Sequence, residues 1–84
     1  MLNYKATSLD TNDYMPGKIL VIEDDAKIAG MVKQYLLQEH YDVLVASDGL
    51  TGLKMARQGQ PDLIILDLML PGMSGTEVCR QLRT

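Results

Sequence analysis

Two short apolar runs, each ending in acidic residues, constrain the fold of this chain more than any other feature. The run at 19–22 (Ile-Leu-Val-Ile) leads into Glu23, Asp24 and Asp25, and the run at 63–66 (Leu-Ile-Ile-Leu) leads into Asp67. Uninterrupted runs of this kind are typical of strands that helices cover on both faces of a parallel sheet. They therefore predict two buried strands that end in carboxylates.

A helical pattern follows the first run. The expected helix buries one stripe at the spacing i, i+4, i+7 and i+8, made of Ile28, Val32, Tyr35 and Leu36. Asp25 directly precedes this pattern and is a candidate N-cap, since its side chain can accept hydrogen bonds from the first turn.

Further elements alternate along the rest of the chain. A short second strand is expected at 43–46, and a second helix begins at Asp48-Gly49 and ends at 59–61. The second helix is expected to bury Leu50, Leu53 and Ala56. Ser74 and Glu77 form a capping-box signature for a third helix. This order predicts an α/β fold with a parallel sheet and helices on both faces.

The first 17 residues differ from the rest. Residues 1–16 are rich in Asn, Thr, Asp and Ser and show neither a two-residue nor a 3.6-residue apolar period. We expect a flexible leader at 1–17 and one domain at 18–84. Translation starting at Met1 and at Met15 are both compatible with the sequence.

Composition excludes several classes of function. The net charge is -3 and no basic stripe is present, so we expect no direct binding of nucleic acid. The apolar runs are too short to span a bilayer, so we expect no membrane contact. A single cysteine, Cys79, cannot form an internal disulfide, which fits a reducing cytoplasm.

The acidic residues predict a metal site. Ligands in open α/β sheets bind beyond the carboxyl ends of the strands, so neighbouring strands at 19–22 and 63–66 would bring Glu23, Asp24, Asp25 and Asp67 together. Such a cluster needs a hard cation, and its oxygen ligands suit Mg²⁺ better than zinc. Asp67 is the best candidate nucleophile toward phosphorus, because a metal beside it would screen the approaching phosphoryl oxygens.

These residues carry a resemblance. The segments 18–25 (Lys-Ile-Leu-Val-Ile-Glu-Asp-Asp) and 62–72 (Asp-Leu-Ile-Ile-Leu-Asp-Leu-Met-Leu-Pro-Gly) resemble the receiver domain of two-component response regulators, over residues 18–83. The resemblance implies a flavodoxin-like fold. It also implies that Asp24 binds Mg²⁺ directly, Glu23 through water and Met69 through its backbone carbonyl. Asp67 is then both ligand and phosphoacceptor.

The same resemblance implies partners. The phosphoryl group would come from a sensor histidine kinase or a phosphotransfer protein. The sequence at 69–72 (Met-Leu-Pro-Gly) is similar to that of regulators that have a winged-helix DNA-binding output domain.

One departure from the family pattern stands out. A complete receiver has five strands, with a Ser or Thr ending the fourth and a Lys ending the fifth, and neither strand occurs in this sequence. We expect a receiver truncated after its third strand and third helix. The third strand would then have an unpaired apolar edge, through which the chain would self-associate.

Other functions compete with this hypothesis, in which the chain is a phosphoacceptor and not an enzyme. An aspartyl-phosphate phosphatase of the haloacid dehalogenase type would need a second Asp two residues after Asp67, where Met69 stands. A further alternative is an acidic metal-binding interaction fragment that cannot switch because the later strands are missing.

Overall fold

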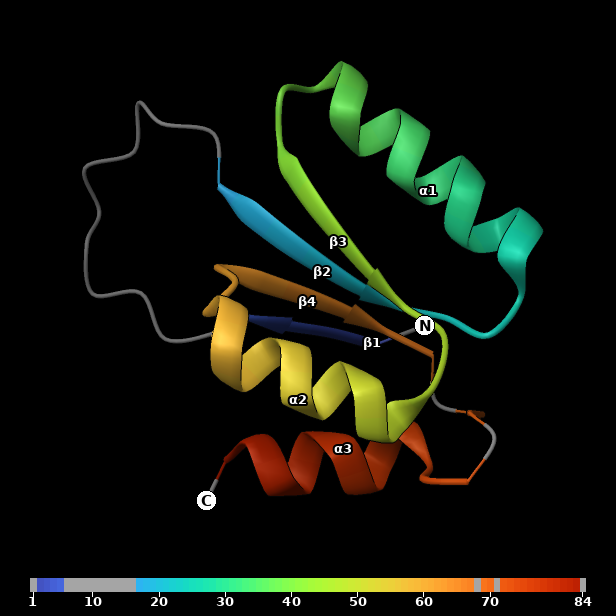
Figure 1. Cartoon of the computed structure of the whole chain (residues 1–84), viewed down its shortest axis with the longest axis vertical. Helices are drawn as coiled ribbons and strands as arrows, with labels where there is room; N and C mark the ends of the chain where they lie inside the picture. The colour runs from blue at the N-terminus through green and yellow to red at the C-terminus, as the bar shows by residue number, and fades with distance from the viewer. Residues whose placement is uncertain (1, 6–16, 68, 71, 84) are drawn as a thin grey trace.

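The computed structural model describes residues 2–5, 17–67, 69–70 and 72–83. Within these residues one four-stranded sheet lies between helices on its two faces (Figure 1). The elements, in chain order, are β1 (Leu2–Lys5), β2 (Lys18–Ile22), α1 (Ala26–Gln38), β3 (Asp42–Ala46), α2 (Gly49–Gly59), β4 (Leu63–Leu66) and α3 (Gly75–Leu82).

Three of the strands form the predicted parallel sheet. The sheet order is β1-β4-β2-β3, and β2 pairs in parallel with both β3 and β4. Ile22, the last residue of β2, stands opposite Ala46 on one side and Leu66 on the other. The three parallel strands therefore end at the same level, and the predicted α/β architecture is confirmed.

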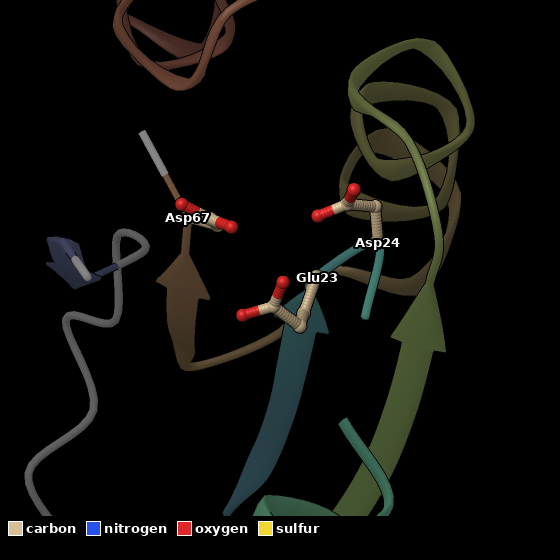
Figure 2. Close-up of side chains that lie close together, drawn as sticks. All are labelled: Glu23, Asp24 and Asp67. Carbon is tan, nitrogen blue, oxygen red and sulfur yellow. The ribbon is translucent and has the colours of Figure 1, made fainter. Parts of the chain in front are cut away.

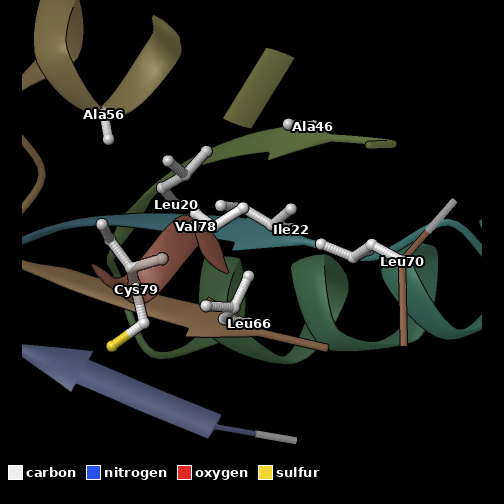
Figure 3. Packing of buried hydrophobic residues seen from close by; sticks show 9 residues of the cluster. Leu20, Ile22, Ala46, Ala56, Leu66, Leu70, Val78 and Cys79 are labelled. Atoms are coloured by element: carbon white, nitrogen blue, oxygen red, sulfur yellow. The ribbon is translucent and has the colours of Figure 1, made fainter. Parts of the chain in front are cut away.

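Alternate residues of the strands build two cores. One face of the sheet packs against α2 and α3 through a cluster that includes Leu20, Ile22, Leu66 and Val78 (Figure 3). On the other face, Ile19 and Val21 pack against α1. Because side chains alternate across a strand, an uninterrupted apolar run serves both faces at once.

Helix α1 buries a narrower stripe than its sequence predicts. Ala29 and Leu36 are buried against the sheet, but Ile28 and Tyr35 are 43% and 62% exposed, so their predicted burial is wrong. The helix contacts β2 and β3. An i, i+4 pattern predicts a face wide enough to meet two neighbours, whereas the extensive contacts of α1 with other described elements are those with β2 and β3.

Helix α2 approaches the sheet through a glycine. Leu53 and Ala56 are buried as predicted, but Leu50 is 64% exposed, contrary to prediction. Gly52 lies against Ile22 so closely that a Cβ atom there would stand 2.5 Å from Ile22 Cδ1. The absence of a side chain at this position therefore lets α2 rest on the central strand.

Gly52 and Gly30 both lie in helices, and alanine in their places is expected to change stability in opposite directions. Gly52→Ala is expected to lower the free energy of unfolding by about 1–3 kcal/mol, the usual cost of overpacking a core. Gly30→Ala in α1 is expected to raise it by up to about 1 kcal/mol, because a Cβ there meets nothing within 4 Å and alanine favours helix. Urea unfolding of both variants checks the pair, and equal effects would contradict this packing.

The amino-terminal residues correct two expectations. Residues 2–5 form β1, which pairs antiparallel with β4, Leu2 opposite Leu66 and Lys5 opposite Leu63. The prediction of a flexible leader is therefore wrong for residues 2–5, while residues 6–16 lie outside the described residues. The predicted unpaired edge at 63–66 is also wrong, because the chain supplies a strand for it. The backbone donors and acceptors of an apolar edge attract any available extended segment.

The caps of the helices follow the sequence in part. Ser74 Oγ accepts the backbone N–H of Glu77 at 3.2 Å, so Ser74 caps α3. The Glu77 carboxylate accepts hydrogen bonds from Arg80 and Gln81, so among the described contacts only the Ser74 half of the capping box forms. No helix in the described part of the chain has the length and apolarity needed to cross a bilayer.

Candidate functional site

The parallel pairing continues one residue beyond the strands. The backbone N–H of Glu23 donates to Ala46 O, and that of Asp67 donates to Ile22 O, both at 3.0 Å. These bonds extend the ladder into the acidic residues and fix where their side chains begin. Figure 2 shows the result: the carboxylates of Glu23, Asp24 and Asp67 point toward one another at the carboxyl ends of β2 and β4.

The three carboxylates form a compact cluster. One oxygen from each of Glu23, Asp24 and Asp67 lies within 4.8 Å of the others. Glu23 is buried, Asp67 is half-buried and Asp24 is exposed. The predicted convergence is confirmed for these three residues, which come from two strands 44 positions apart in the sequence. Their roles as ligands and phosphoacceptor stay predictions.

Asp25 does not join the cluster through its side chain. Its Oδ1 accepts the backbone N–H groups of Lys27 at 2.9 Å and Ile28 at 3.2 Å, which makes it the N-cap of α1 as predicted. Its own N–H donates to Glu23 Oε2 at 3.1 Å. The two adjacent acidic residues therefore have different roles. The side chain of Asp24 faces the cluster, and the side chain of Asp25 caps the helix.

The local environment shifts the pKa values of Glu23 and Asp67 in opposite directions. Burial raises the pKa of Glu23, and the neighbouring Asp67 adds to this, although the N–H of Asp25 opposes it. The pKa of Asp67 is lowered, chiefly because the backbone N–H of Met69 donates to its Oδ1 at 3.0 Å. Asp67 therefore keeps its negative charge, whereas the charge on Glu23 is costly without a cation.

The hydrogen bond from the Met69 amide to Asp67 is a contact of the site that the sequence analysis did not foresee. The resemblance assigns a role to the backbone carbonyl of Met69, and the structure shows its N–H holding the Asp67 carboxylate. The Met69 side chain is 84% exposed. Backbone groups leave no trace in residue type, so no sequence pattern could have marked this contact.

These residues fit Mg²⁺. All three side chains offer oxygen ligands, and the exposed position of Asp24 leaves room for the water molecules that Mg²⁺ retains. The sulfur of Cys79 lies elsewhere, since this residue of α3 is packed into the core between the helix and the sheet (Figure 3). Two carboxylates with a third close by therefore suit a small divalent cation that also binds a phosphate oxygen.

Removing the buried charge of Glu23 is expected to stabilise the metal-free protein. Glu23→Gln should raise the free energy of unfolding at pH 7, because the folded state disfavours ionised Glu23. The gain should fade as the pH falls through the raised pKa of Glu23 and vanish below 4.5, its ordinary value, since a protonated Glu23 carries no charge. Asp42→Asn is the control, because Asp42 is exposed at the opposite end of the sheet. Thermal unfolding at pH 7 and pH 4 measures both, and an equal response of the two variants would contradict the prediction.

Comparison with known proteins gives the same family as the resemblance of the sequence motifs. The family model "Response regulator receiver domain" matches residues 19–84. DNA-binding response regulator MtrA of Mycobacterium tuberculosis is 49% identical over 71 residues, which are 84% of this chain and 31% of MtrA. The transcriptional regulatory protein PhoP of Bacillus subtilis is 49% identical over 69 residues, which are 82% of this chain and 29% of PhoP. The chain thus spans under a third of the length of these relatives.

Solved structures agree. The BeF3-activated N-terminal receiver domain of Klebsiella pneumoniae RstA is 38% identical with a TM-score of 0.76, covering 79% of this chain and 56% of that one. Vibrio cholerae chemotaxis protein CheY4 is 35% identical with a TM-score of 0.77, covering 82% and 57%. The sheet, the acidic cluster and these matches together show that the chain belongs to the response regulator receiver domain family.

Proposed function

We propose that this chain accepts a phosphoryl group on Asp67. Asp24 and Asp67 would bind Mg²⁺ directly, Glu23 through water, and the backbone carbonyl of Met69 would complete the protein ligands. The observation that carries the proposal is the meeting of Glu23, Asp24 and Asp67 within 4.8 Å at the carboxyl ends of adjacent strands. Like charges at this separation call for a shared cation.

The residues around Asp67 prepare it as a nucleophile. The Met69 N–H holds Oδ1 and fixes the rotation of the carboxylate, and the lowered pKa keeps the group ionised. In the transfer, a carboxylate oxygen of Asp67 forms a bond to phosphorus while the bond from phosphorus to the donor nitrogen breaks. The donor imidazole leaves with that electron pair and takes up a proton. The bound cation supplies charge stabilisation for the phosphoryl oxygens.

The donor follows from this chemistry. A phosphohistidine carries a phosphoryl group on nitrogen, and we propose that a sensor histidine kinase or a phosphotransfer protein presents it. The relatives are described as DNA-binding or transcriptional regulators, so we propose that the chain serves transcription control. We place this activity in the cytoplasm, where the free, buried thiol of Cys79 stays reduced.

Incubation with a small phosphodonor tests the function. The chain with Mg²⁺ and acetyl phosphate should gain the mass of one phosphoryl group in intact-protein mass spectrometry, and excess EDTA should prevent the gain. Magnesium binding without any mass gain would favour the non-switching metal-binding fragment. Continuous release of phosphate over many turnovers would favour the haloacid dehalogenase type of phosphatase, which the exposed Met69 two residues after Asp67 opposes.

A further inference from the structure

The side chains that follow Asp67 lie in opposite environments. The side chain of Met69 is 84% exposed, whereas that of the next residue, Leu70, is only 9% exposed. Leu70 belongs to the core cluster beneath α2 and α3, and Figure 3 shows its side chain pointing toward Ile22, the last residue of β2. The chain therefore returns to the core at Leu70, directly after the residue whose N–H holds the Asp67 carboxylate.

The backbone of Met69 has a fixed neighbour on each side. Before it, the N–H of Asp67 donates to Ile22 O at 3.0 Å, and after it, Leu70 packs into the same cluster as the Ile22 side chain. A peptide unit is planar, so the position of Leu70 limits how the peptide between Met69 and Leu70 can rotate. That peptide contains the Met69 carbonyl, which the proposed function assigns to the metal.

The far end of the connection between β4 and α3 is held as well. Met73 packs against the same core cluster, and its carbonyl oxygen would lie 2.7 Å from a Cβ atom at Gly49, the first residue of α2. This close approach leaves the connection little room to move against α2. Among the described residues from 67 to 74, Leu70 is the only one that is buried.

We propose that Leu70 is a positioning residue of the acidic site. Its burial holds the Met69 backbone in place, so that the Met69 N–H can hold Asp67 and the Met69 carbonyl can face the metal. The inference rests on the proposed function and adds to it a residue that acts through Met69. An apolar side chain suits this role, because burial holds it and it offers no oxygen that would compete for the cation.

Two leucines of nearly equal burial make a matched test. Leu36 is 8% exposed and packs on the opposite face of the sheet, so Leu70→Ala and Leu36→Ala remove the same atoms from different cores. Both variants lose stability by opening a cavity. Only Leu70→Ala should free the Met69 amide, whose exchange with water in the metal-free protein should be at least about 10-fold faster than in Leu36→Ala, as measured by NMR. The Lys27 amide also donates to an aspartate carboxylate, and in Leu70→Ala it should exchange as in the parent.

Metal affinity links this anchor to the site. In isothermal titration calorimetry, Leu70→Ala should bind Mg²⁺ at least about 10-fold more weakly than Leu36→Ala, the cost commonly seen when a group that orients a metal ligand is lost. Leu70→Met should bind Mg²⁺ about as well as the parent, because methionine fills a similar apolar volume. Leu70→Val and Leu36→Val remove fewer atoms and give the same comparison, with the same order expected, if the alanine variants do not fold.

Two results would overturn the proposal. One is equal exchange of the Met69 amide in folded variants of the two leucines. The other is faster exchange in the Leu70 variant with unchanged Mg²⁺ affinity, because the anchor would then not serve the site. A parent protein that binds no Mg²⁺ would instead contradict the proposed function, and the exchange comparison would still decide whether Leu70 holds the Met69 amide.

Discussion

Asp67→Asn is expected to reduce phosphoryl uptake from acetyl phosphate by about two orders of magnitude or more, since loss of an enzyme nucleophile commonly costs still more. The amide of asparagine is a poor nucleophile, but it keeps the shape of aspartate and can still accept the Met69 N–H through its oxygen. The fold should therefore survive, and circular dichroism and thermal unfolding should confirm this. Intact-protein mass spectrometry in the presence of Mg²⁺ measures the uptake.

The matched control for this substitution is Asp42→Asn. Asp42 is an exposed carboxylate at the first residue of β3, and it lies at the end of the sheet opposite the acidic cluster. It should leave uptake unchanged. Equal labelling of Asp67→Asn and the parent would assign the phosphoryl group to another residue and would remove the basis of the proposed function.

Asp24→Asn should weaken Mg²⁺ binding by at least about 10-fold, because loss of even an outer-shell partner of a metal site costs about 10- to 100-fold in affinity. Asp24 is the exposed member of the cluster, so its substitution removes a proposed ligand without opening a cavity. It also removes one repelling charge and should raise the metal-free stability, by less than Glu23→Gln because water screens an exposed charge. Isothermal titration calorimetry measures the affinity.

The next residue provides a sharp control for this experiment. Asp25→Ser retains a good N-cap for α1 and removes a neighbouring carboxylate, which the structure uses for capping. Its Mg²⁺ affinity should stay close to that of the parent. If Asp25→Ser weakened binding as much as Asp24→Asn did, affinity would depend on total local charge and not on a defined ligand.

Much of the fold was predictable because local pattern and tertiary structure agree in it. The runs at 19–22 and 63–66 are apolar throughout and rich in β-branched residues, as strands covered on both faces are. Asp25, Asp48 and Ser74 each precede a helical pattern, and each caps the helix that follows. These signals are local, so a single sequence contains them in full.

The failures share a physical cause, which is dependence on distant parts of the chain. Nothing in Leu-Asn-Tyr-Lys at 2–5 indicates a strand, because β1 exists through its pairing with β4, about 60 positions away. Likewise, Ile28 and Tyr35 fit a buried stripe by spacing, yet burial also needs a neighbouring element. Gly52 reads as a poor helix residue until its contact with Ile22 is known.

The candidate site lies between these cases. The carboxylates could be identified from their positions at strand ends, and their convergence followed once β2 and β4 were taken as neighbours. The division between Asp24 and Asp25, the burial of Glu23 and the Met69 amide required coordinates. Side-chain direction and backbone hydrogen bonds decide these features, and residue type specifies neither.

The most direct measurement is a crystal structure of the chain soaked in Mn²⁺, with the ion located by its anomalous scattering. One strong peak should lie between Asp24 and Asp67, within bonding distance of both carboxylates and with Glu23 at its water shell. A cluster of Glu23, Asp24 and Asp67 that stays free of metal at saturating Mn²⁺, or a peak bound only elsewhere, would contradict the proposal that these three carboxylates share one cation.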